Sequence, residues 1–100
     1  DPKLVLMDEP FGALDALTRE KMNLEMLRIW EESHKTFIVV THSIQEAVFL
    51  GSRCAVLTAG PARMAEAFPI ELPSPRKLHV KTTPEFGQYV SRVYSLLGVE

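Results

Sequence analysis

Two adjacent carboxylates follow an apolar run near the start of this 100-residue chain. Residues 4–7 (Leu-Val-Leu-Met) lead directly into Asp8 and Glu9, and Pro10 ends the run. An unbroken apolar run of this kind predicts a strand that is covered on both faces in a parallel sheet. Ligands of such sheets bind beyond the carboxyl ends of the strands. The two carboxylates therefore lie either at a site or in an ordinary polar turn, and this segment alone favours neither.

A histidine follows the second apolar run. Residues 37–41 (Phe-Ile-Val-Val-Thr) predict another buried strand, which His42 closes. The intervening segment is long enough for a helix and a right-handed crossover, which predicts a βαβ unit with parallel strands. His42 should therefore lie at the same sheet edge as Asp8 and Glu9. This convergence favours a site over a turn.

These residue types suit phosphoryl chemistry. One carboxylate can hold a hydrated Mg²⁺, and a second can orient or deprotonate an attacking water. A histidine on the neighbouring strand can then contact the terminal phosphate. A zinc hydrolase would need more good ligands, and the chain has no Gly-x-Ser-x-Gly elbow for Ser-His-Asp catalysis.

Capping signals predict the helices that position these residues. We expect Asp15 to be the N-cap of a helix over residues 16–32, because its carboxylate can accept a hydrogen bond from an amide in the first turn. Ser43 and Glu46 have the form of a capping box for a short helix, which Gly51 ends. Each helix thus starts shortly after one of the two polar segments.

The rest of the chain predicts a hairpin and a last helix. Strands over residues 53–57 and 63–68 flank a turn signal at residues 58–61. Residues 69–75 contain three prolines and predict an extended segment without regular structure. Pro84 occupies the favoured first position of a carboxyl-terminal helix.

Composition excludes several classes of protein. Hydrophobic residues make up 46% of the chain, which is enough for a core. The net charge is -2 without a dense Lys/Arg run, which argues against a nucleic-acid-binding surface. The single cysteine, Cys54, excludes an internal disulfide and lies in an apolar run, which indicates a buried small side chain.

Three motifs resemble those of ABC-transporter ATPases, in the family's order and spacing. Residues 4–10 resemble the Walker B strand, residues 11–15 the D-loop, and residues 39–43 with 46–47 the switch-histidine segment. The resemblance covers at least residues 1–57. It implies an α/β fold that is part of a P-loop NTPase: a parallel βαβ core with a small β hairpin and a carboxyl-terminal helix.

The resemblance implies roles for four residues, with ATP and Mg²⁺ as cofactors. Asp8 would hold Mg²⁺ through water, and Glu9 would polarise the attacking water. His42 would contact the γ-phosphate, and Asp15 would act across a nucleotide-sandwich dimer. The alternative for His42 is a satisfied histidine at a strand end. The alternative for Asp15 is a plain helix cap, which is compatible with the first role.

The carboxyl-terminal half resembles the nitrate/sulfonate/taurine importer branch, through residues 46–51, 71–76 and 82–86. Ser43 and Ser52 depart from the Asp that many family members carry, at positions not expected to perform chemistry. The resemblance implies a second ATPase subunit, a transmembrane permease and a solute-binding protein as partners, without nucleic acid. It also implies a cytoplasmic location on the inner face of the membrane.

The sequence contains no Gly-x-x-x-x-Gly-Lys-Ser/Thr loop and none of the family motifs that precede the Walker B strand. We therefore expect a carboxyl-terminal fragment without the phosphate-loop strand: residues 1–68 from the ATPase core and residues 69–100 as a proline-rich extension with a helix. Alone, it should be inactive and should self-associate through exposed strand edges. Alternatives are a structural or regulatory module, or a piece of a non-transport ABC ATPase.

Overall fold

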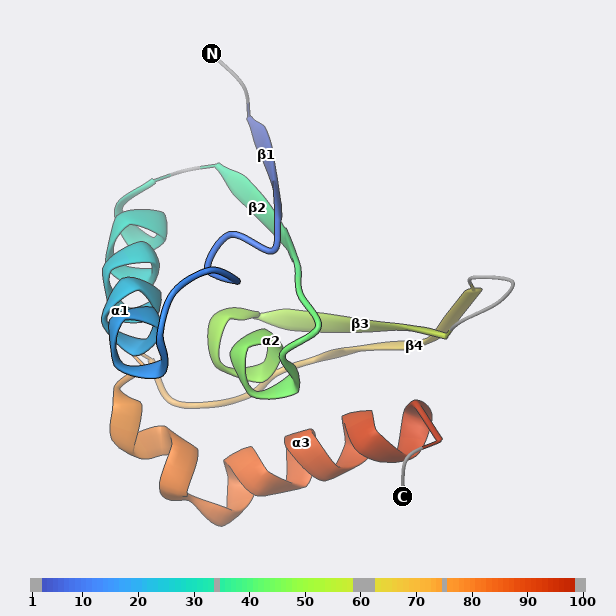
Figure 1. Cartoon of the computed structure of the whole chain (residues 1–100). Coiled ribbons are helices and arrows are strands. Elements are labelled where there is room, and N and C mark those ends of the chain that lie inside the picture. The colour runs from blue at the N-terminus through green and yellow to red at the C-terminus, as the bar shows by residue number, and fades with distance from the viewer. Residues whose placement is uncertain (1–2, 34, 59–62, 75, 99–100) are drawn as a thin grey trace.

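The computed structural model describes residues 3–33, 35–58, 63–74 and 76–98. Its strands form two sheets, a parallel pair and an antiparallel hairpin. Helix α1 lies beside the parallel pair, and α3 runs along the hairpin on the opposite side of the molecule (Figure 1). The elements follow in the order β1 (Leu4–Asp8), α1 (Ala16–Glu32), β2 (Thr36–Val40), α2 (Ile44–Leu50), β3 (Arg53–Thr58), β4 (Arg63–Pro69), the 3₁₀ helix η1 (Leu78–Thr82) and α3 (Pro84–Leu96).

The predicted βαβ unit is confirmed. Strands β1 and β2 pair in parallel, with Leu6 opposite Ile38 and Asp8 opposite Val40. Helix α1 forms the crossover and covers one face of the pair, where the rings of Trp30 and Phe37 stack with centroids 5.0 Å apart. The carboxyl ends of both strands therefore meet at one edge, as the topology requires.

The prediction that these strands are covered on both faces is wrong for the described residues. Both strands alternate between exposed and half-buried positions. The exposed positions form what we call the open face: Leu4, Leu6, Ile38 and Val40, each between 44% and 67% exposed. One crossover helix can cover only one face of a two-stranded sheet, and no other described element packs over the second.

The core lies around α2. Val48 and Phe49 of this short helix are completely buried, and α3 packs against it through Phe86 and Val93, which are also buried. The hairpin adds alternate residues from its inner face: Cys54, Val56 and Phe68. Because its apolar residues come from both halves of the chain, the core ties the carboxyl-terminal segment to the βαβ unit.

A half-buried arginine holds the carboxyl end of α2. Arg76 donates from Nη1 to the carbonyl oxygens of Phe49 at 2.9 Å and Gly51 at 2.6 Å, and from Nη2 to that of Ile70 at 3.0 Å. Burial lowers the pKa of the guanidinium. The last carbonyls of a helix lack partners within the helix, and a cation there also offsets the negative end of the helix dipole. Residues 70–74 of the proline-rich segment are irregular, as predicted, whereas Pro69 ends β4. Arg76 follows this segment and docks it on the core.

The hairpin and the last helix are confirmed, with one addition. Strands β3 and β4 pair antiparallel, but residues 59–61 of the predicted turn lie outside the described residues. The 3₁₀ helix η1 was not predicted. It leads into Thr83, whose hydroxyl caps α3 by accepting from the Phe86 amide at 3.3 Å. Cys54 is buried, which raises the pKa of its thiol and supports the expected packing role.

Two glycines in different surroundings give a matched test of this packing. A Cβ on Gly51 would lie 2.7 Å from the Arg53 carbonyl oxygen and 3.0 Å from that of Ala47, whereas one on Gly87 would meet nothing within 4 Å. We expect Gly51→Ala to lower the free energy of unfolding by about 1–3 kcal/mol. Gly87→Ala, in α3, should raise it by about 0.5–1 kcal/mol. Urea denaturation of both variants measures this, and equal effects would contradict the account.

Candidate functional site

The two carboxylates lie where the chain leaves β1. Glu9 has a φ of 48°, in the left-handed region that residues other than glycine rarely occupy. Its amide donates to the Val40 carbonyl oxygen at 2.7 Å, which extends the ladder by one bond beyond the strand. Such backbone strain clusters at functional sites. Here it turns the chain sharply, so that Asp8 and Glu9 stay at the sheet edge.

Glu9 and His42 come together at this edge. The Glu9 Oε1 atom accepts a hydrogen bond from the His42 backbone amide at 2.6 Å. The same oxygen lies 3.8 Å from Nε2 of the His42 imidazole. The His42 side chain is 97% exposed, whereas that of Glu9 is 37% exposed. The carboxylate thus holds the histidine segment through the main chain and leaves the imidazole open to a ligand.

Asp8 is exposed, and its carboxylate has no hydrogen bond or ion pair within the described part of the chain. Magnesium in phosphoryl-transfer sites is bound by one or two carboxylates, several waters and the phosphates of the substrate. Asp8 fits this kind of site. Among the described residues no three His, Cys, Asp or Glu side chains gather as metal ligands.

Asp15 is the N-cap of α1, as its sequence context predicted. Its Oδ1 atom accepts from the Thr18 amide at 2.8 Å. This hydrogen bond lowers the pKa of the carboxyl. Asp15 forms no hydrogen bond or ion pair with Asp8, Glu9 or His42 in the described structure, so it stands apart from the group at the sheet edge.

Two residues near the site have roles that the sequence analysis missed. Arg19, in the first part of α1, donates to carbonyl oxygens of the loop that follows Glu9. Glu46 was identified as part of a capping box and of two family-like segments, without a role of its own, yet it is among the most deeply buried charged residues described, at 4% exposed. One signal could have indicated Arg19: side chains in a helix lean toward its amino end, so a long cation four residues after the cap can reach the preceding loop.

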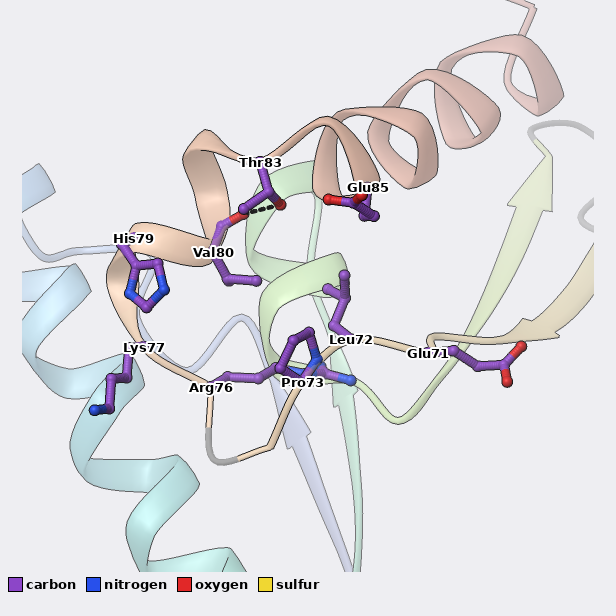
Figure 2. A pocket seen from close by; sticks show the side chains of 9 residues that line it. All are labelled: Glu71, Leu72, Pro73, Arg76, Lys77, His79, Val80, Thr83 and Glu85. Carbon is purple, nitrogen blue, oxygen red and sulfur yellow. Dashed lines mark hydrogen bonds between the residues drawn. The ribbon is translucent and has the colours of Figure 1, made fainter.

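Two hollows of the surface lie away from this sheet edge. One, of about 150 Å³, is lined by the proline-rich segment, η1 and the start of α3, with Leu72, Pro73 and Val80 around it (Figure 2). A second, of about 320 Å³, shares Glu71 and Glu85 with the first. Neither is lined by Asp8, Glu9 or His42. The candidate site therefore lies away from these two hollows.

Comparison with known proteins identifies relatives along the whole chain. An ABC transporter ATP-binding protein of Methanocaldococcus jannaschii is 47% identical over 100 residues, covering 100% of this chain and 36% of its own. The aliphatic sulfonates import ATP-binding protein SsuB of Bacillus subtilis is 44% identical, covering 95% and 36%. The taurine import ATP-binding protein TauB of Roseobacter denitrificans is 43% identical, covering 97% and 38%. No protein-family model matches the chain.

The chain is thus homologous to the ABC transporter ATP-binding proteins, and the resemblance that its three motifs indicated is confirmed. Within that family its relatives include sulfonate and taurine import proteins, in agreement with the importer branch that its carboxyl-terminal half resembles. The chain spans only somewhat more than a third of the length of these relatives. No helix among the described residues is long and apolar enough to cross a membrane.

Proposed function

We propose that this chain supplies the hydrolytic residues of the ATP-binding subunit of an ABC importer for a sulfonate-like or taurine-like solute. One observation carries the proposal: Glu9 and His42 are in contact at the carboxyl edge of a parallel strand pair, next to Asp8, the last residue of β1. The names of the sulfonate and taurine import relatives support the solute class.

Each residue has a distinct role in this proposal. Asp8 holds Mg²⁺ through water, and the ion offsets charge on the phosphates of bound ATP. Glu9 orients and polarises the water that attacks the γ-phosphate. His42, whose imidazole is free of the core, donates to the γ-phosphate. Asp15 acts across a dimer of two such subunits while it caps α1.

The chain alone lacks most of what nucleotide binding requires. The phosphate loop, which holds phosphates with backbone amides and a lysine, is absent from the sequence. We infer that the loop belongs to the remaining two thirds of a longer subunit, as the coverage of the relatives suggests. In this proposal residues 1–68 complete the ATPase core and residues 69–100 form an extension. The isolated chain is inactive.

The longer subunit would act together with other chains. We propose a second ATP-binding subunit, a transmembrane permease and a solute-binding protein as its partners, without nucleic acid. The subunit would lie at the cytoplasmic face of the membrane, attached through the permease. The import function in the names of SsuB and TauB supports this arrangement.

A change at Glu9 in the complete subunit tests the proposed function. Glu9→Gln should lower the turnover of ATP at least about 100-fold while ATP stays bound, because the variant keeps the nucleotide contacts and loses the group that activates water. Phosphate release and retention of labelled ATP measure the two effects. Glu25→Gln, an exposed change on α1, serves as the control. Unimpaired turnover in Glu9→Gln would refute the role.

The open face predicts the behaviour of the isolated chain. An apolar strand face and unpaired strand edges favour association with a second copy. We propose that the chain forms dimers or larger assemblies, and that the double change Leu6→Glu and Ile38→Lys shifts it toward the monomer. Light scattering at high protein concentration measures this. A monodisperse wild-type monomer would rule the proposal out.

A further inference from the structure

The loop between Glu9 and α1 is held by one side chain. Arg19 donates from Nε to the Phe11 carbonyl oxygen at 3.2 Å, and from Nη2 to the carbonyl oxygens of Gly12 at 3.2 Å and Leu14 at 3.4 Å. Phe11 is buried in the core, which anchors the loop from its other side. The path of the loop is therefore fixed by a buried ring and a guanidinium that binds three of its carbonyl groups.

The same guanidinium faces a buried carboxylate on another element. Arg19 Nε lies 4.0 Å from Glu46 Oε2, and that oxygen has no hydrogen-bond partner within the described residues. A buried charge without a partner is costly, and removing one member of a buried pair costs more than the pair itself contributes. Among the described residues, Arg19 is the cation that forms an ion pair with Glu46, so its guanidinium faces the buried carboxylate.

The pair joins the two segments that follow the site residues. Arg19 holds the loop that begins after Glu9, and Glu46 lies in α2, which begins two residues after His42. Ser43 fixes the start of α2 by accepting from the Glu46 amide at 3.3 Å. A shift of the loop would therefore move Arg19, and through Glu46 it would move the helix that carries His42 at its entrance.

We propose that Arg19 and Glu46 are positioning residues, which couple the loop at residues 11–14 to the segment that presents His42. This inference rests on the proposed ATPase function. Neither residue touches the nucleotide in this account. Together they keep His42 and Glu9 in register, so that the histidine meets the γ-phosphate while Glu9 orients the water. Small displacements of catalytic groups reduce rates strongly, which is why such a pair would matter for turnover.

Two single variants of the complete subunit separate the functions of the pair. Glu46→Gln removes the charge but keeps the size of the side chain, and Arg19→Lys keeps the charge but loses the planar fork that binds three carbonyls. We expect either change to lower kcat for ATP hydrolysis about tenfold or more. The KM for ATP should stay within about twofold, because the nucleotide contacts remain.

The double variant provides the decisive comparison. If the residues act as one unit, the combined change lowers kcat no further than the more damaging single change. Arg28→Gln is the matched control: this exposed arginine of α1 pairs with Glu25 and Glu32, and its loss should leave kcat unchanged. Melting temperatures show whether each variant is folded at the assay temperature. If Glu46→Gln does not fold, the kcat and KM of Arg19→Lys alone test the inference.

Several results would overturn the inference. A folded single variant with unchanged kcat would show that the pair only stabilises the fold, as would a lower melting temperature without a kinetic effect. Multiplicative losses in the double variant would show that the residues act separately. Glu9→Gln tests the ATPase function itself, so wild-type turnover in this variant would reject that function. If Glu9→Gln lowers turnover but the Arg19 and Glu46 variants do not, only the proposed coupling is rejected.

Discussion

The parallel pairing of β1 and β2 is the constraint on which the rest of the site depends. It brings two chain segments that are far apart in the sequence to one sheet edge. The ladder then continues through the Glu9 amide to Val40, and the Glu9 carboxylate binds the next free amide of the second segment, that of His42. Charge-assisted hydrogen bonds of this kind are the stronger ones in proteins. Glu9 keeps its strained backbone conformation because two hydrogen bonds hold the residue, one from its amide to Val40 and one from the His42 amide to its carboxylate.

Arginines fix the elements on either side of that edge by a common physical means. Arg19 binds the carbonyl groups of the loop after β1, and Arg76 binds those at the end of α2. In both cases a planar guanidinium satisfies several backbone acceptors that have no partner in a helix or sheet. The helix that follows His42 is thereby held at its start by a cap and an ion pair, and at its end by Arg76.

Sequence reasoning succeeded where the cause is local. The caps at Asp15 and Ser43, the proline at the start of α3, the crossover helix and the hairpin strands follow from short-range patterns, and the structure has all of them. The placement of Glu9 beside His42 also followed, because parallel strands leave little choice of edge.

Long-range contacts were beyond the reach of these patterns. Nothing near Arg76 in the sequence reveals that its guanidinium will bind carbonyl groups at the end of α2. The exposure of Leu6 and Ile38 depends on what covers the second face of the sheet, and an apolar run cannot indicate how many elements are present to do so. The chemical roles of Asp8, Glu9 and His42 stay predictions, since they rest on motif resemblance and geometry.

The central claim is that this chain carries the hydrolytic half of a nucleotide site, whose phosphate-binding half lies in another part of a longer subunit. Calorimetric titration of Mg²⁺-ATP into the 100-residue chain and into the complete subunit tests it most directly. The account predicts binding by the complete subunit and no detectable heat of binding for the chain alone at micromolar ATP. Micromolar affinity of the isolated chain would contradict it.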